Sequence, residues 1–223
     1  MKKSKLLYLM ATLVIGVCLL SCNNDDTPAQ NLYYDVATLV SSQNNVTVCE
    51  VQQDGDSPVA TYTFTNAQLN TNEWAPGCRL LIAYTLDNSK PYETGNGNLY
   101  GWGYVYTPTL TEGTSESTSS WSTEVQNLLQ IWRTGKWINI ISSCTYSDKH
   151  PDVYKVVADA ETLDSEYPVV RVIYESDKNA GAETQYLYTS VDIESLWERP
   201  NAKGIRFTIL DITGAQSFVF EKQ

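Results

Sequence analysis

The segment CRLLIAYTL, residues 78–86, decides the fold class, because every second position in it is apolar or aromatic. These positions are Cys78, Leu80, Ile82, Tyr84 and Leu86. Successive side chains of a β-strand point to opposite faces, so this alternation predicts a strand with one face in a core. The dipeptide Pro76-Gly77 precedes the segment and is typical of a turn. The segment therefore predicts a protein built from sheets.

Similar short runs cover the rest of the chain and are separated by clusters of Gly, Asn, Asp and Ser. No apolar run of helical period extends beyond about a dozen residues. Further strands are expected at 46–51, 59–64, 99–106, 128–132, 136–146, 154–159, 168–175, 185–192, 204–212 and 217–221. For 124–132 a short helix is an alternative, and we prefer a helical turn that passes into a strand. Asp192 is expected to cap one helical turn at 193–197, and the whole pattern predicts an all-β protein.

A change of composition at residues 111–120, TEGTSESTSS, divides the chain. This segment contains Ser, Thr, Glu and Gly and no apolar residue, which is typical of a linker between domains. We therefore place one domain at 33–112 and a second at 120–223. In the second domain, strands that alternate with turn signals about every ten residues favour a β-sandwich.

Residues 1–21 have the features of an export signal. Three lysines precede the uncharged run 6–20, and the small residue Ser21 stands before Cys22. As a helix the 15-residue run would be roughly 22 Å long, short of a hydrocarbon layer of roughly 30 Å, so it is expected to direct export rather than to span. The order of these features resembles the bacterial lipobox, whose cysteine receives a diacylglyceryl group and becomes the new N-terminus.

Cys22 is accordingly predicted to be the lipid-attachment residue, and residues 22–32 are predicted to be an acylated tether. An ordinary signal peptide with an incidental Cys22 is the alternative. Several acyl chains on one residue bind a membrane durably. Asn23, in place of an acidic residue, suggests the outer membrane by lipoprotein sorting. Asp25 and Asp26 resemble the acidic export signal of Bacteroidetes surface lipoproteins, although a solvated tether is an equal interpretation, so the periplasmic and cell-surface faces both stay open.

The charge of the mature chain argues against a nucleic-acid partner. Removal of the signal takes three lysines and no acidic residue, which leaves 12 basic against 26 acidic residues and a net charge of −14. Binding to phosphates needs clustered lysines and arginines, and between Cys22 and the linker the sequence has only Arg79 and Lys90.

The sequence has no established catalytic or metal motif. Its only histidine, His150, lies in a polar segment and is expected to be a solvated loop residue, which excludes zinc sites built on two histidines. The glycines of 95–103 miss the spacing of a dinucleotide-binding loop. Asp54 and Asp56 flank a turn glycine without the other ligands of a calcium loop. We expect no enzyme, no cofactor and no metal, and carboxylates paired only in space are the remaining hydrolase alternative.

Three cysteines, Cys49, Cys78 and Cys144, remain in the folded part of the chain. An exported protein is able to hold a disulfide, and Cys49 with Cys78 is the more plausible pair because both lie in the first half. Cys78 and Cys144 are in phase with apolar neighbours, which favours small buried side chains instead.

The sequence holds 15 tyrosines and 6 tryptophans, and the strand expected at 99–106 carries Tyr100, Trp102 and Tyr104 on one face. An exposed row of such rings could stack on sugars or anchor a protein partner, so these three are the candidate ligand-binding residues. The alternative is that the row lines a barrel core. We favour the core, because the opposite face carries two glycines and a valine, which could not fill it.

Five segments, together with the lipobox, resemble the NigD-like lipoproteins of Bacteroidetes. They are residues 75–86, 132–140, 167–175, 186–197 and 204–210. The resemblance covers most of the mature chain and implies an N-terminal OB-type β-barrel at 33–112, followed by a C-terminal β-sandwich at 120–223. The family is named after a member in a bacteriocin operon for which an immunity role was proposed. It brings no catalytic residues.

The function expected from the sequence is that of a lipid-anchored lipoprotein of the outer membrane without enzyme activity. It would have a binding or bacteriocin-immunity role, with the membrane as one partner through Cys22 and a protein as another. The alternative is a surface lipoprotein that binds or handles glycans through residues such as Tyr100, Trp102 and Tyr104.

Overall fold

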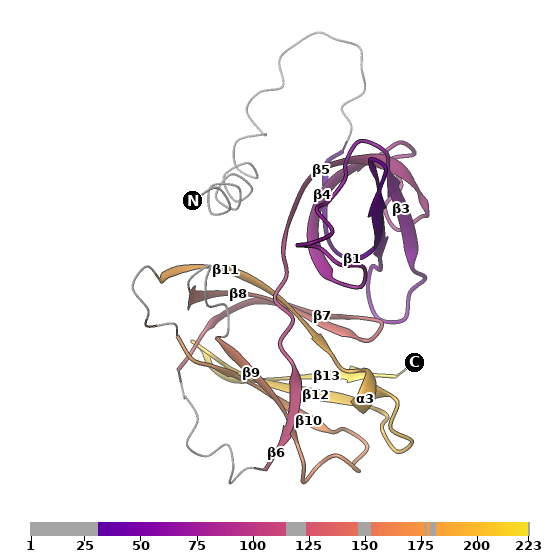
Figure 1. Ribbon diagram of the computed structural model, residues 1–223. Helices are drawn as coiled ribbons and strands as arrows, with labels where there is room; N and C mark the ends of the chain where they lie inside the picture. The colour runs from indigo at the N-terminus through magenta and orange to yellow at the C-terminus, as the bar shows by residue number, and fades with distance from the viewer. Residues whose placement is uncertain (1–30, 115–123, 147–152, 177, 179–181, 223) are drawn as a thin grey trace.

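The computed structural model describes residues 31–114, 124–146, 153–176, 178 and 182–222. These residues form thirteen strands and one short helix, which confirms the all-β class. The strands make a closed barrel and two further sheets, and the barrel lies on one side of the sheets (Figure 1).

The barrel consists of β1 (Tyr33–Gln43), β2 (Val46–Val51), β3 (Ala60–Phe64), β4 (Arg79–Leu86) and β5 (Gly95–Tyr104). Its strand order is β1-β2-β3-β5-β4, and it closes between β4 and β1. β3 and β5 pair in parallel, whereas the other neighbours are antiparallel. The barrel core is apolar and aromatic, with Tyr62, Phe64 and Tyr84 in mutual contact.

The segment CRLLIAYTL forms β4, and Leu80, Ile82 and Tyr84 lie in the barrel core as the alternation predicts. The expectation that only one face of this strand is buried is wrong, because all eight residues of β4 are buried. At Arg79 the outer face is covered by side chains of the neighbouring sheet. The alternation of apolar residues along one strand predicts which face lies in the core, but it does not predict what packs on the other face.

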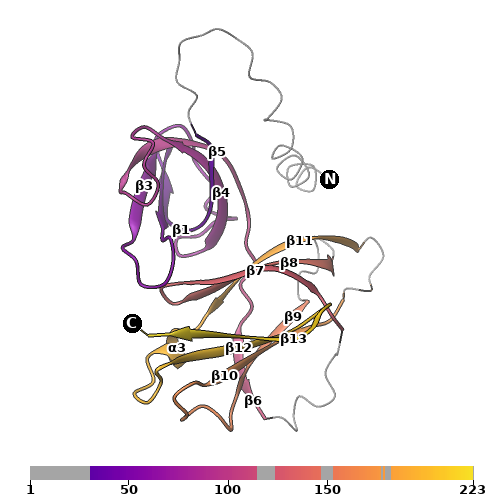
Figure 2. The same cartoon turned by 180° about the vertical axis from the view of Figure 1, so that it is seen from behind.

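The other two sheets contain eight strands. A five-stranded sheet has the order β13-β12-β10-β9-β6, and a three-stranded sheet has the order β11-β8-β7. Their bounds are β6 (Leu110–Gly113), β7 (Asn127–Thr134), β8 (Trp137–Tyr146), β9 (Tyr154–Asp159), β10 (Val169–Tyr174), β11 (Glu183–Asp192), β12 (Gly204–Asp211) and β13 (Gly214–Glu221). A single buried cluster draws on both sheets, for example Ile138 and Ile140 from β8 and Phe207 from β12. The two sheets therefore enclose one core. Figure 2 shows from behind how they lie one over the other.

Several local expectations differ from the structure. β1 and β6 are not among the expected strands. The strand expected at 128–132 is confirmed by β7, but the helical turn expected before it is wrong, because Glu124 and Gln126 form isolated β-bridges. The helical turn α3 (Glu194–Trp197) is confirmed, but its N-cap residue is Ile193, and Asp192 instead accepts the Glu194 N–H at 2.9 Å.

β6 lies in the segment assigned to the first domain, yet it pairs in parallel with β9 of the five-stranded sheet. The barrel strands therefore end at Tyr104, before the change of composition at 111–120. This difference arises because a short strand carries no local signal for a partner more than forty residues away. The division at 33–112 and 120–223 otherwise stays a prediction.

The chain passes from the barrel to the sheets beside β11. Tyr106 donates its N–H to Tyr188 O at 2.7 Å and accepts the Ser190 N–H at 2.8 Å. Tyr106 also belongs to the core between the sheets. The connection between the barrel and the sheets is therefore hydrogen-bonded to β11 and packed into the core between the sheets.

Gly97 provides a test of barrel closure, because it pairs with Leu86 where β5 crosses β4 closely. A Cβ at Gly97 would lie well inside van der Waals contact with the carbonyl oxygen of Thr85. We predict that Gly97→Ala lowers the free energy of unfolding by about 3 kcal/mol, since the backbone of β4 would have to move. At Gly95, on the same strand, an added Cβ would lie 3.4 Å from Asn88 Nδ2 and 3.8 Å from Glu93 O, which are ordinary contacts. Gly95→Ala should therefore change the free energy of unfolding by less than about 0.5 kcal/mol. Urea unfolding of both variants measures the difference, and equal effects would contradict this account of closure.

Candidate functional site

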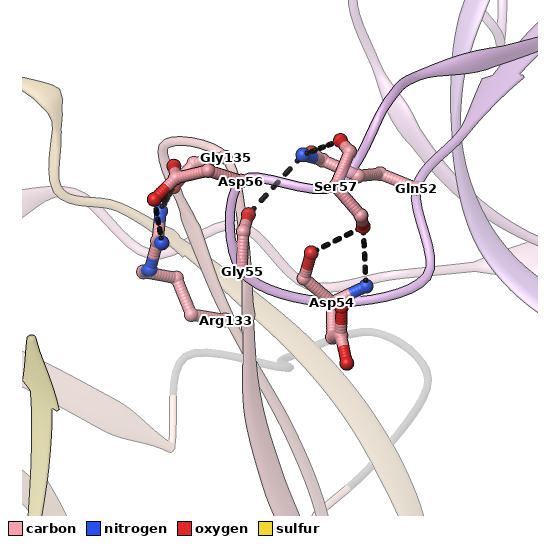
Figure 3. A network of polar contacts seen from close by, with 7 residues as sticks. All are labelled: Gln52, Asp54, Gly55, Asp56, Ser57, Arg133 and Gly135. Carbon is pink, nitrogen blue, oxygen red and sulfur yellow. Dashed lines mark hydrogen bonds and ion pairs between the residues drawn. The ribbon is translucent and has the colours of Figure 1, made fainter. Parts of the chain in front are cut away.

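The β2–β3 loop of the barrel, residues 52–59, reaches the β7–β8 hairpin of the three-stranded sheet. Gly55 pairs with Thr134 as an isolated bridge, donates to Arg133 O at 2.7 Å and accepts the Gly135 N–H at 2.8 Å. Gly55 and Gly135 have φ values of 46° and 52°, in the left-handed region that glycine adopts at little cost. The two glycines allow two tight turns to meet backbone to backbone (Figure 3).

Arg133 fastens this contact through its guanidinium. Nη1 and Nη2 donate to the two carboxylate oxygens of Asp56 at 2.8 and 2.6 Å, and Nη1 also donates to Gly135 O at 2.7 Å. The guanidinium carbon lies 4.1 Å from the ring centroid of Trp197, a cation–π distance. The Arg133 side chain is 4% exposed, whereas that of Asp56 is 46% exposed. The arginine side chain is thus removed from water, and its carboxylate partner remains at the rim.

The loop that presents Asp56 is held by its own side chains. Gln52 Nε2 donates to Gly55 O at 3.1 Å and to Ser57 O at 2.6 Å, and Ser57 Oγ accepts the Asp54 N–H at 3.1 Å. Asp56 reaches Arg133, while Asp54 stands apart from that pair (Figure 3). The sequence predicted a plain hairpin turn here. It missed the role of Asp56, because the partner of Asp56 is 77 residues away.

Arg79 of β4 makes the second connection and is buried as deeply as Arg133. Its Nη1 donates to Thr38 Oγ1 at 2.8 Å, its Nη2 to Asn139 Oδ1 at 2.9 Å, and its Nε to Ser190 Oγ at 3.3 Å. Its guanidinium carbon lies 5.1 Å from the Trp137 ring centroid. All three acceptors are neutral, and burial lowers the pKa of Arg79 to about 10, so it remains a cation at neutral pH.

The polar network around Arg79 continues into the sheet. Ser190 Oγ donates to Asn139 Oδ1 at 2.7 Å, and Asn139 Nδ2 donates to Thr134 Oγ1 at 2.9 Å. Thr134 lies in the turn that meets Gly55. The hydrogen-bonded network around Arg79 therefore ends at Thr134, the residue next to Arg133 in the sequence. We name the set of Asp56, Arg79, Arg133, Asn139 and Ser190 the arginine junction.

The three candidate ligand-binding aromatics of β5 have unequal positions. Tyr100 is 62% exposed and Tyr104 is 52% exposed, while Trp102 is half-buried against the barrel core. The expectation that this row lines the core is therefore wrong for Tyr100 and Tyr104.

A register shift explains the exposure of Tyr100, whereas Tyr104 pairs with Leu80 at the last residue of β5. Ala83 pairs with Gly101 and Tyr84 pairs with Leu99, so Tyr100 has no partner on β4. Such a bulge breaks the period of two, and Leu99 takes the buried position beside Tyr84. More than half of each tyrosine is exposed, and whether the two bind a ligand stays a prediction.

The cysteines agree largely with the interpretation as buried thiols. Cys49, Cys78 and Cys144 are free, Cys49 and Cys144 are buried, and Cys78 is half-buried. Burial raises the pKa of the Cys49 thiol to about 12 and that of Cys144 to about 11, so neither is ionised at neutral pH. The disulfide between Cys49 and Cys78 is not formed. Cys22 and His150 lie outside the described residues.

The described part of the chain contains no group of three or more His, Cys, Asp or Glu side chains that could hold a metal ion. None of the helices described is long and apolar enough to cross a membrane. Chemically, the arginine junction is a structural contact between the barrel and the three-stranded sheet.

Comparison with known proteins finds relatives by structure. No family model matches the sequence, and no curated protein matches it. A protein of unknown function (DUF1344) from Bacteroides vulgatus has a TM-score of 0.67 at 11% identity and covers 86% of this chain and 92% of its own. A NigD-like immunity protein from Bacteroides caccae has a TM-score of 0.57 at 15% identity, with 89% and 100% covered. A Bacteroides fragilis protein classed as a lipoprotein has a TM-score of 0.55 at 10% identity, with 86% and 97% covered.

At such identities these likenesses establish a shared fold. They confirm at that level the resemblance to NigD-like proteins seen in the sequence, and they extend over both the barrel and the sheets. None of the three is described as an enzyme.

The arginine junction predicts an effect of Asp56 on stability. Asp56→Asn should lower the free energy of unfolding at about pH 7 by about 1–2 kcal/mol, because Arg133 would lose a charged partner that is itself half exposed. The hydrogen bonds from Arg133 hold the pKa of Asp56 below its usual range. A lowered pKa stabilises the fold above the unfolded value of about 4, and this contribution is lost as the pH falls below it.

The measurement is urea unfolding of wild type and variant from about pH 7 down to about pH 2, with Asp54→Asn as the matched control in the same loop. The difference between wild type and Asp56→Asn should shrink on acidification, and Asp54→Asn should differ from wild type by less than about 0.5 kcal/mol throughout. An Asp56 effect that persists unchanged at the lowest pH would argue against the ion pair as its source.

Proposed function

We propose that this protein is a lipid-anchored, non-enzymatic lipoprotein of the outer membrane that binds a protein partner in the manner of an immunity protein. The observation that carries the proposal is the likeness in fold to the NigD-like immunity protein, which extends over 89% of this chain. The lipobox at residues 19–22 supports the anchor. The likeness to the Bacteroides fragilis protein classed as a lipoprotein points the same way.

The proposal includes a finer description of the architecture. The order β1-β2-β3-β5-β4, with β3 and β5 parallel, supports an OB-type barrel. The single core between the other two sheets supports a β-sandwich. The arginine junction would then be the contact between an OB barrel and a sandwich.

In this proposal the anchor sets the distance between the folded body and the bilayer. Eleven residues, 22–32, precede β1, and a fully extended chain of that length reaches at most about 40 Å. The body would therefore remain close to the membrane, where an immunity protein would intercept a toxin that acts on the envelope. Both the periplasmic and the cell-surface face suit such a role.

A second candidate function, glycan binding, has one observation in its favour. Tyr100 and Tyr104 are exposed on β5, and tyrosine rings stack on the apolar faces of sugars. Tyr186 on β11 is exposed to a similar extent and serves as a control outside β5. If the protein binds glycans, Tyr100→Ala and Tyr104→Ala should each lose binding on a glycan array while Tyr186→Ala retains it. Equal binding by all three variants would remove this candidate.

The anchor is tested by Cys22→Ala, which should move the protein from the membrane fraction to the soluble periplasmic fraction, because the acylated residue is lost. Cys18→Ala, in the predicted signal, is the matched control and should leave the membrane fraction unchanged. Immunoblots of the separated fractions provide the measurement. A Cys22→Ala protein that stays in the membrane fraction would refute the anchor.

The immunity role predicts protection of the cell that carries the protein. A strain that lacks the gene should be killed by the culture supernatant of at least one related strain that the parent survives, and the wild-type gene should restore survival. Cys22→Ala should restore it poorly, since the protein would no longer be held at the envelope. If no supernatant in a broad panel distinguishes the parent from the deletion strain, the immunity role is wrong.

A further inference from the structure

A second polar cluster lies at the end of the barrel where β1 begins, and the proposed function does not use it. Asp35 of β1 is partly exposed there. Tyr84 Oη donates to Asp35 Oδ2 at 2.6 Å, and Tyr92 Oη donates to Asp35 Oδ1 at 3.1 Å. A carboxylate oxygen has two lone pairs, so each oxygen is able to accept a further hydrogen bond. We name Asp35, Tyr33, Tyr62, Tyr84 and Tyr92 the Asp35 cluster.

Asp35 has no cationic partner among the described residues. The nearby β4–β5 loop, residues 87–94, contains one basic residue, Lys90, and its ammonium lies 3.5 Å from Glu93 with both side chains mostly exposed. Burial raises the pKa of Asp35, although the hydrogen bonds from Tyr84 and Tyr92 oppose the shift. The carboxylate therefore lies in a partly desolvated place where an added cation would be stabilised.

Aromatic rings surround this carboxylate. The Tyr84 ring lies 5.6 Å from that of Tyr33 and 5.1 Å from that of Tyr62. Tyr62 and Tyr84 are fully buried, whereas Tyr33 and Tyr92 are half-buried at the rim. A cation that approaches Asp35 would pass the two rim tyrosines, and aromatic faces attract ammonium groups.

The loop that supplies Tyr92 is held in a costly conformation. Ser89 and Tyr92 have φ values of 54° and 63°, in the left-handed region that bulky side chains rarely adopt. Tyr33 Oη donates to Ser89 O at 3.1 Å, and the Tyr92 N–H donates to Tyr62 Oη at 2.6 Å. These bonds hold the Tyr92 phenol against Asp35. Backbone strain of this kind is concentrated at ligand clamps and switch regions.

We propose that the Asp35 cluster binds an alkylammonium group, with the carboxylate as its counter-ion and the rim tyrosines covering its alkyl chain. The group would be a primary amine, because its three N–H donors match the free lone pairs of the carboxylate and the phenol oxygens around it. Its source is either a free small amine or a lysine side chain of a polypeptide. The proposal uses neither Tyr100 nor the acyl group expected on Cys22, so it does not depend on the proposed function.

The test is an NMR titration of the Asp35 side-chain carboxyl carbon at neutral pH with n-butylammonium chloride. Sodium chloride at equal ionic strength and 1-butanol are the control titrants. A saturable shift with butylammonium and none with either control is expected. A second titration with Nα-acetyl-lysine amide, whose side-chain ammonium is free, distinguishes the sources. Tighter binding than that of butylammonium indicates a lysine side chain, and weaker binding indicates a free amine.

Two variants complete the test. Asp35→Asn should weaken butylammonium binding at least about tenfold, because the counter-charge is lost, whereas Glu93→Gln, which removes a carboxylate from the same end of the barrel, should leave it within about twofold. Equal binding by wild type and Asp35→Asn would overturn the proposal. If Asp35→Asn does not fold, the wild-type titration decides alone, and a carboxyl shift that fails to saturate or that sodium chloride reproduces overturns it.

Discussion

The rest of the structure depends on the buried guanidinium of Arg79. An arginine side chain removed from water is tolerated only if its N–H groups find acceptors, since unmet donors on a charged group cost several kcal/mol. Arg79 meets this requirement with Thr38 of its own barrel and with Asn139 and Ser190 of the three-stranded sheet. The acceptors lie on β1, β8 and β11. All the hydrogen bonds of Arg79 therefore form only when the barrel packs against the three-stranded sheet at this position. Arg133 of the three-stranded sheet likewise needs an acceptor, and it finds one in Asp56 of the barrel.

This polar contact explains how two units with separate apolar cores hold a definite relation to each other. Each core is complete in itself, one inside the barrel and one between the sheets. An apolar contact would tolerate sliding, whereas hydrogen bonds to a planar guanidinium have directions that admit one arrangement. The crossing at Tyr106 adds backbone hydrogen bonds beside β11 and limits rotation about the connection. The strand β5, which bears the exposed Tyr100 and Tyr104, thereby has a fixed orientation relative to the two sheets.

The thiols described are protonated or half-buried, and the residues described include no cluster of metal-binding side chains. What the molecule offers instead are exposed aromatic rings on β5 and a carboxylate ringed by tyrosines at the end of the barrel. In the proposed function, such features would serve to select a binding partner.

The sequence by itself determined the all-β class, most strand positions and the inner face of β4, because alternation over a few residues reports local burial. It also predicts export and acylation of Cys22 from the order of residues 2–22, a prediction that needs no folded structure. Only the tertiary structure decided the partner of β6, the exposure of Tyr100 and the roles of Asp56 and Arg79. Each of these depends on a residue far away in the sequence or on a bulge that shifts the period of two. A pattern along one strand carries no information on which strand, turn or side chain will lie opposite it, and that is decided when the layers pack.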